Sequence, residues 1–261
     1  EDVNFVNING RDVPIDLYLK ILGYLISEGC LYKSKERSNY TMAVSQLTSS
    51  DAYKNMYNAF NAFSDFIGKK CINTIKKAGS GFSEHTPKEK WEGRIHSKDV
   101  VNHFINEICQ DNIPNSYYKK IPRWVLNLSK EKLTILLNAL VEGDGSEIYS
   151  KYNSKTKSFR YATVSKQLAD DVYEIVFKCG FAPNINISRR KDRDFNEYTV
   201  LWSNTNYGLE PLVGTAKSIY GAKVHTINYE GIVWCFEVPT GLFVTRRKNK
   251  VTIQGNSKFA Q

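Results

Sequence analysis

The sequence lacks the features of several large protein classes. No apolar run among its 261 residues approaches the roughly 18–20 residues that a membrane span needs. The opening residues EDVNFVNING have neither the basic nor the apolar region of a secretion signal. The five cysteines form no Cys-x-x-Cys pair, and the four histidines stand at no zinc-ligand spacing. We therefore expect a cytoplasmic protein with reduced thiols, no structural zinc and no membrane contact; a bacterial, archaeal or phage host is not distinguished.

Positive charge, in contrast, is abundant. The chain has 36 lysines and arginines against 27 acidic residues, a formal net charge of +9. Hydrophobic residues make up 41%, which is typical of a globular protein. Such a charge favours a polyanionic partner, nucleic acid first. A basic surface that serves only solubility is the alternative.

An internal repeat organises most of the chain. The segments LKILGYLISEGCLY (19–32) and LTILLNALVEGDGSEIY (133–149) both run from an apolar helix through an acid-Gly pair toward a strand. Downstream, YTMAVSQLTSSDAYKNMYNAF (40–60) matches YATVSKQLADDVYEIVFKCGF (161–181). Each has an alternating strand that ends at Val-Ser, then a polar start to an amphipathic helix. Two matches in the same order indicate a duplication rather than a coincidence.

Each repeat is expected to contain four strands separated by polar turns. The predicted strands are, in chain order, residues 31–34, 39–46, 71–77, 92–97, 146–152, 158–165, 184–190 and 197–203. Between the repeats, Pro122 suits the first turn of a linker helix, and Ser129 suits the N-cap of the second acid-bearing helix. After residue 222 the chain becomes strand-rich, and RRKNK (246–250) predicts a hairpin.

Small residues form a stripe on each acid-bearing helix. Gly23 and Ser27 share one face of the first helix, and Ala139 and Gly143 share one face of the second. Side chains this small let two helix backbones approach closely. We therefore expect the two helices to pack side by side along these stripes.

The acids Glu28 and Asp144 stand at the C-terminal ends of these helices, where the helix dipole disfavours an anion. Gly29 and Gly145 follow them and suit the left-handed position that ends many helices. If the helices pair, the two carboxylates meet and require a cation, and hard oxygen ligands indicate Mg²⁺. The alternative is an ordinary helix end with an idle, exposed acid.

The predicted strands and turns carry the positive charge, and their polar residues alternate with apolar ones, as in SFRYATVSK. This pattern suits a sheet with one face in the core and the other against DNA phosphates and base edges; a plain solvated face is the alternative. The candidate DNA-binding residues are Lys33, Lys35, Arg37, Lys76, Lys77, Arg94, Lys151, Lys155, Lys157, Arg160, Arg189, Arg190, Lys191 and Arg193.

The stretches ILGYLISEG (21–29) and LNALVEGDG (137–145) resemble the nine-residue motif of the LAGLIDADG homing endonucleases, in their single-chain, two-repeat form. The resemblance implies an α+β fold in which two pseudo-symmetric αββαββα repeats form a DNA-binding saddle. It also implies a monomeric, site-specific nuclease that cuts both strands of a long double-stranded DNA site, with Glu28 and Asp144 as the ligands of Mg²⁺.

The resemblance also concerns basic residues near the scissile phosphates. Lys119 or Lys120, in a Lys-Lys-Ile-Pro block before the second motif, is the candidate for this role, although the block could equally be a linker feature. Glu142 lies within the second motif but occupies neither metal position of the family.

The C-terminal segment resembles the last splicing blocks of inteins. The stretches that carry this resemblance are VWCFEVPTGLFV (233–244) and VTIQGNS (251–257). The resemblance implies that Asn256 cyclises and cleaves its own peptide bond, and that Ser257 is the first residue of the host protein. A strand pair that only stabilises the fold is the alternative.

Three positions depart from the intein pattern. Gly255 stands where the penultimate His is usual, Cys235 replaces the usual Asp, and Gly241 replaces a His. The chain also begins at Glu1, without the Cys or Ser and the first splicing blocks of an intein. We therefore expect splicing, if it occurs, to need an N-terminal intein fragment as partner.

Together these features predict four parts. Residues 1–118 hold the first repeat, 119–222 the linker and second repeat, 223–256 a β-rich splicing segment of the Hint type, and 257–261 a remnant of the host protein. Two other functions stay open. One is the C-terminal part of a split intein with an inert endonuclease fold, and the other is a nucleic-acid-binding protein of this family that does not cleave.

Overall fold

The computed structural model describes residues 3–33, 39–77, 88–149, 157–189, 195–204, 228–232, 236–247 and 250–255. The chain divides into two compact units, Glu1–Asn206 and Tyr207–Gln261. Both repeats lie in the first unit. The finer predicted boundaries at residues 118, 222 and 256 stay predictions.

The first unit opens with a hairpin that the sequence analysis missed. Strands β1 (Phe5–Ile8) and β2 (Arg11–Pro14) pair antiparallel, and Asn9 and Gly10 form the turn with φ values of 50° and 80°. An Asn-Gly pair between two short strands is a strong hairpin signal, because both turn residues need positive φ. The signal was therefore present in the sequence.

The first repeat contains four strands and three helices. In chain order they are α1 (Ile15–Ser27), β3 (Gly29–Lys33), β4 (Tyr40–Leu47), α2 (Ala52–Phe66), β5 (Cys71–Lys77), β6 (Glu89–His96) and α3 (Lys98–Ile108). The strands form an antiparallel sheet in the order β3-β4-β6-β5. Alternate residues such as Met42, Val44, Trp91 and Ile95 are buried. One face of this sheet therefore packs against helices and the other is open.

A linker joins the two repeats. It contains the short helices η1 (Gln110–Asn112), η2 (Ser116–Tyr118) and α4 (Arg123–Leu126). The predicted linker helix is thus a single turn, and Pro122 immediately precedes it.

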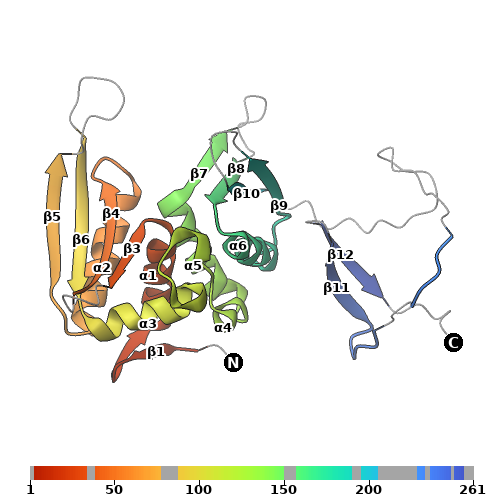
Figure 1. Cartoon of the computed structure of the whole chain (residues 1–261), viewed down its shortest axis with the longest axis horizontal. Helices are drawn as coiled ribbons and strands as arrows, with labels where there is room; N and C mark the ends of the chain where they lie inside the picture. The colour runs from red at the N-terminus through yellow and green to blue at the C-terminus, as the bar shows by residue number, and fades with distance from the viewer. Residues whose placement is uncertain are drawn as a thin grey trace. The chain divides into compact units, whose positions relative to one another are not determined.

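The second repeat follows the same plan through its fourth strand, and the last helix of its predicted αββαββα order would lie outside the described residues. Its elements are α5 (Lys130–Asp144), β7 (Gly145–Tyr149), β8 (Lys157–Thr163), α6 (Lys166–Lys178), β9 (Asn184–Arg189) and β10 (Asn196–Ser203), with the sheet order β7-β8-β10-β9. The Ser129 hydroxyl accepts a hydrogen bond from the Lys132 N–H, as an N-cap does. All eight predicted strands are present. In Figure 1, α1 and α5 lie side by side between the two sheets.

The strand register fixes which residues of the two matching segments are equivalent. Val44 pairs with Gly29, and Tyr161 pairs with the equivalent Gly145, so Val44 is the counterpart of Tyr161. Strand β4 also continues past its Val-Ser pair to Leu47. The reason is that Ser165 itself caps α6, whereas a turn separates β4 from α2.

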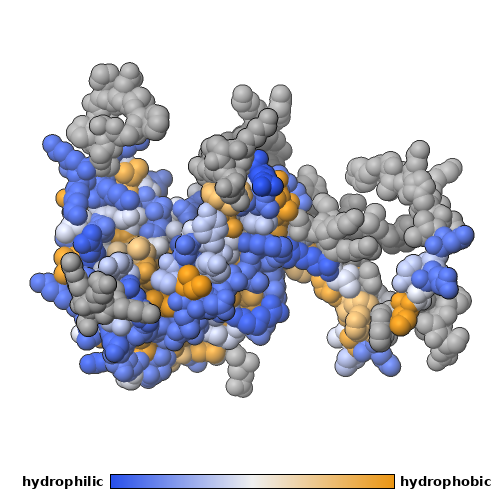
Figure 2. Space-filling model, viewed as in Figure 1, coloured by the Kyte–Doolittle hydropathy of each residue, from blue (hydrophilic) through white to orange (hydrophobic). Residues whose placement is uncertain are grey.

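The described part of the second unit contains the predicted hairpin, β11 (Leu242–Arg247) paired antiparallel with β12 (Lys250–Gly255). Leu242, Val244 and Ile253 share one face of it and are each at least half exposed. Figure 2 shows these strands as an apolar patch, whereas the first unit is mostly hydrophilic on the face in view. None of the described helices combines the length and the apolar composition that crossing a membrane needs.

Candidate metal and nucleic-acid site

The ends of α1 and α5 lie against one another. A Cβ on Gly23 would lie 2.6 Å from the Ala139 Cβ, and a Cβ on Gly143 would lie 1.9 Å from the Ser27 Oγ. Neither distance leaves room for a methyl group. The small-residue stripes thus pack face to face, and they bring the two helix ends together.

The predicted role of Gly29 and Gly145 is wrong. Gly145 has φ −77° and ψ 162°, and Gly29 is not among the described residues with positive φ. A Cβ on Gly29 would lie 2.4 Å from the Leu25 Cα, and one on Gly145 would lie 2.5 Å from the Val141 Cα. Each strand leaves its helix by passing over the preceding turn. Glycine is required for this close passage and not for a left-handed turn.

Both acids therefore stand at a junction between helix and strand that has no loop. Glu28 is the first residue after α1, and its N–H donates to the Tyr24 carbonyl at 2.9 Å. Asp144 is the last residue of α5. A Cβ on Gly143 would lie 3.6 Å from the Glu28 Cγ, which places the Glu28 side chain beside the last turn of α5.

Burial acts on both carboxyl groups, and the charge of Asp144 also acts on Glu28. Burial raises the pKa of Glu28, the nearby Asp144 raises it further, and Lys90 and Lys119 oppose the rise. Burial also raises the pKa of Asp144, and Lys119 opposes it. The Asp144 carboxylate lies close enough to Glu28 to disfavour its charge, and a cation between the two groups would stabilise both.

Lys119 lies at this site. Its Nζ donates to the carbonyls of Ile26 at 2.6 Å and Leu25 at 3.5 Å, so a positive charge caps the C-terminus of α1. Burial lowers its pKa, while Asp144 and then weaker contributions that include Glu28 oppose the change.

Lys120 is placed differently. Its N–H donates to the Ile108 carbonyl, and its charge acts on Cys109 rather than on either acid. Of the two predicted lysines, the structure brings Lys119 to the carboxylates.

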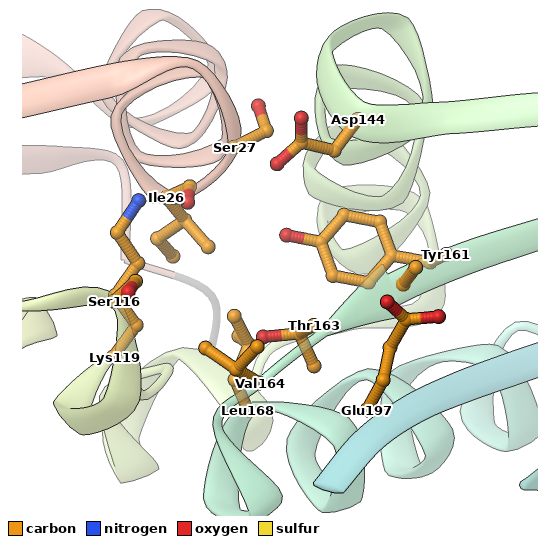
Figure 3. A pocket seen from close by; sticks show the side chains of 11 residues that line it. Ile26, Ser27, Ser116, Lys119, Asp144, Tyr161, Thr163, Val164, Leu168 and Glu197 are labelled. Atoms are coloured by element: carbon orange, nitrogen blue, oxygen red, sulfur yellow. Dashed lines mark hydrogen bonds between the residues drawn. The ribbon is translucent and has the colours of Figure 1, made fainter. Parts of the chain in front are cut away.

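A cavity of about 280 Å³ opens between the helix ends and β8. Its lining includes Asp144, Ser27, Lys119, Tyr161 and Glu197. In Figure 3 the Asp144 carboxylate lies beside the Ser27 hydroxyl, and the Tyr161 hydroxyl points into the cavity. Tyr161 and Glu197 were not predicted as site residues, because neither lies near Glu28 or Asp144 in the sequence.

Glu142 lies on the other side of the helix pair. Its carboxylate accepts hydrogen bonds from the Tyr24 hydroxyl at 2.5 Å and from the Asn55 amide at 2.9 Å. It therefore stabilises the packing of α1, α2 and α5 rather than the candidate site.

The register of the strands sorts the predicted DNA-binding residues. Because side chains alternate between faces, Lys76 and Arg94 lie on the open face of the first sheet, opposite the buried Trp91, and Arg160 lies on the open face of the second. Four others lie at strand ends on the helix-covered side, where they are exposed: Lys33, Lys77, Lys157 and Arg189.

Several predictions fall outside the described residues. They are the DNA-binding candidates Lys35, Arg37, Lys151, Lys155, Arg190, Lys191 and Arg193 and the splicing candidates Cys235, Asn256 and Ser257. Lys90, in contrast, was missed by the sequence analysis. It lies on the open face of β6 and is exposed, and its charge lowers the pKa of Glu28. The sequence signal was its position next to Trp91: because side chains alternate along a strand, a buried Trp91 places Lys90 on the open face.

Comparison with solved structures finds a similar fold in a homing endonuclease. Mesophilic variants of I-DmoI match with a TM-score of 0.51 at 17% identity, over 73% of this chain and 89% of theirs. I-DmoI in complex with DNA and Mn matches with a TM-score of 0.50 at 16% identity, over 72% and 89%. The mixed α/β fold with antiparallel sheets is thus similar to that of LAGLIDADG endonucleases, which confirms the predicted fold relationship at this level.

Sequence comparison finds segments of two longer proteins. The chain is 28% identical over 187 residues to the A subunit of DNA gyrase from Mycobacterium kansasii, which is 69% of this chain and 28% of that protein. It is 24% identical over 175 residues to the C-terminal section of the beta subunit of DNA-directed RNA polymerase from Stigeoclonium helveticum, which is 54% of this chain and 16% of that protein. The chain spans less than a third of either relative. No protein-family profile matches the sequence.

Proposed function

We propose that the chain is a site-specific double-strand DNA endonuclease of the homing type, in which Glu28 and Asp144 hold a divalent cation. One observation carries the proposal. Two partly buried carboxylates, with pKa values raised by burial, meet at the C-terminal ends of two paired helices. The similarity of the fold to I-DmoI, whose structures contain DNA with Mn or Ca, supports the same classes of ligand.

The donor set fits Mg²⁺. Within the described residues, no group of three His, Cys, Asp or Glu side chains could hold a metal. Two carboxylates are nevertheless a typical protein contribution for Mg²⁺, which keeps several waters and takes substrate phosphate oxygens. A cation between Glu28 and Asp144 would also remove the repulsion that raises the pKa of Glu28.

When bound, the cation would activate water and stabilise the leaving 3′-oxygen. The chain's own residues have separate tasks. Lys119 compensates the carboxylate charge and fixes the end of α1 through two carbonyls. The basic residues on the open faces, such as Lys76, Lys90 and Arg94, bind phosphates and set the position of the DNA.

The test is cleavage of a plasmid that carries the uninterrupted host gene across the junction encoding SKFAQ, incubated with the full chain and Mg²⁺. We expect a linear product of defined size. Glu28→Gln and Asp144→Asn should each abolish cutting of at least one strand while DNA binding persists. The matched control is Glu142→Gln, which changes an acid of the same motif outside the site and should cut normally. Normal cutting by both site variants would contradict the assignment of the metal ligands.

A second function, protein splicing, is favoured by two observations. The chain matches short segments of two proteins with different names, as a mobile insertion would. The apolar face formed by Leu242, Val244 and Ile253 is exposed, as expected for a segment that completes its fold with a partner. The proposal is that this is the C-terminal part of an intein.

The test of splicing uses the full chain mixed with an N-terminal intein fragment. Ligated product should form with the wild type and disappear with Asn256→Ala. A mixture that yields no ligated product would leave the C-terminal hairpin as a structural element. If the chain neither cuts nor splices but binds DNA, the non-cleaving alternative replaces both proposals.

A further inference from the structure

We propose that Tyr161 is a positioning residue of the endonuclease site: its hydroxyl donates a hydrogen bond to an oxygen, of water or of the scissile phosphodiester, held beside the Asp144 carboxylate. The inference rests on the proposed function, because it concerns the same cavity.

The position of Tyr161 follows from the strand register. It lies in β8 between Gly145 of β7 and Val200 of β10. Its side chain faces the helices and is 1% exposed. The hydroxyl reaches the cavity at the end of α5, where Figure 3 shows it pointing into the open space.

The hydroxyl has no partner of its own. In the described parts of the chain it makes no hydrogen bond, whereas the buried hydroxyls of Tyr18 and Tyr24 bond to His103 and Glu142. The Tyr161 side chain lines the cavity, so its hydroxyl can be satisfied only by water or by a bound group there. The cavity of about 280 Å³ has room for several waters or a phosphate group, at roughly 30 Å³ per water. The missing partner is therefore expected inside the cavity.

Charge determines what that partner is. Burial raises the pKa of Tyr161 well above its ordinary value, and Asp144 and Glu28 raise it further. A phenol hydroxyl is a hydrogen-bond donor. Asp144 and Tyr161 line the same cavity, and no hydrogen bond joins them, so one oxygen in the cavity is the natural partner of the Tyr161 hydroxyl. Lys119 lines the same cavity and favours an oxygen with negative charge.

The equivalent position of the first repeat holds no such donor. The counterpart of Tyr161 is Val44, which is fully buried and has no polar atom in its side chain. The hydrogen bond is therefore available to only one half of the site. Removing it should slow cleavage of one DNA strand more than the other.

The experiment compares Tyr161→Phe with Tyr24→Phe, which removes a hydroxyl from the opposite side of the same helix pair. The first measurement is the Kd of Mn²⁺ for the free protein, by electron paramagnetic resonance. Tyr161→Phe should weaken binding about tenfold, as is typical when a residue that orients a ligand is lost. The second measurement is the nicking rate of each strand of the cleaved plasmid. One strand should be cut about three- to tenfold more slowly. Tyr24→Phe should change neither quantity.

Equal Mn²⁺ affinity and equal strand ratios in Tyr161→Phe and wild type would overturn the proposal. Asp144→Asn separates this result from failure of the proposed function. If Asp144→Asn loses Mn²⁺ and Tyr161→Phe does not, only the role of Tyr161 fails. If Asp144→Asn also binds normally, the site itself fails. Should Tyr161→Phe be less stable than wild type, both quantities are measured below its melting temperature, where the variant is folded and the same two outcomes apply.

Discussion

The two repeats share a backbone plan but differ in chemistry where helix meets sheet. In each, the helix ends at an acid, glycine starts the strand, and the sheet has the same order. Among the described residues, however, Lys119 caps only the carbonyls at the end of α1. Tyr161 pairs with Gly145 at the start of β7, whereas its counterpart Val44 pairs with Gly29 at the start of β3. The duplication thus keeps the positions of the two acids. Lys119 and Tyr161, which lie near the acids, each have no chemically equivalent counterpart among the described residues of the other half.

The open faces of the two sheets differ as well. The first carries Lys76, Lys90 and Arg94, although Arg94 pairs with Glu92 at 2.5 Å. The described open face of the second has Arg160 as its only basic residue, and Asn184, Asn186 and Ser188 are among its polar groups. Unequal faces suit a DNA site whose two halves have different sequences.

The largest expected effect comes from removing the lysine that distinguishes α1 from α5. Lys119→Met should reduce cleavage about 100-fold, since loss of a buried, hydrogen-bonded charge costs roughly 3 kcal/mol. The remaining carboxylates would also need a higher pH to ionise, so the acid limb of the pH–rate profile should move upward. Lys120→Met is the matched control and should behave as wild type. An equal loss of cleavage in both variants would contradict the assignment of this role to Lys119 alone.

The second test concerns the seam that both repeats share. Gly143→Ala should destabilise the protein by about 1–3 kcal/mol, because its methyl group would overlap Ser27. Gly23→Ala should lower the stability in the same way, because its methyl group would overlap Ala139. Adding Ala139→Gly to the Gly23→Ala variant should restore the stability. Chemical denaturation measures both. Wild-type stability in Gly143→Ala would show that the helix ends are not in close contact.

A third test compares the sheet faces. Replacing Lys76, Lys90 and Arg94 together by Ala should weaken DNA binding more than Arg160→Ala, and each lost phosphate contact should lower the salt dependence of log K by about 0.9. Titration of binding against salt concentration measures this. An equal effect of Arg160→Ala alone would mean that the second sheet makes the stronger contacts.

The smallest effect concerns stability in the absence of metal. Because the folded pKa values of Glu28 and Asp144 are raised, the native state binds more protons than the unfolded state between the unfolded and folded pKa values. Their contribution to stability is therefore present at low pH and is lost as pH rises through the folded pKa values. Asp144→Asn should raise the melting temperature slightly at neutral pH in a chelator, and less so at low pH. A lower melting temperature would contradict the buried-charge argument.

Much of this arrangement could be predicted from local patterns. All eight repeat strands, the Ser129 cap and the pairing of the small-residue stripes follow from periodicity and residue size. The roles of Gly29 and Gly145 could not, because a glycine after a helix serves left-handed and close-packed geometry equally well. The place of Tyr161 at the site could not be predicted, because it depends on the pairing of Tyr161 with Gly145, which is a long-range contact. The separation of Lys119 from Lys120 likewise required the position of the carbonyls of α1.

The junctions without loops have a consequence for where DNA would be cut. Glu28 is the only residue between α1 and β3, and Asp144 is followed directly by β7. Under the proposed function, each acid therefore has a fixed position relative to the strand that contacts the DNA. The distance between the bases read and the bond cut is set by covalent geometry. A single inserted residue at either junction should displace that strand's cut or abolish it, rather than loosen it.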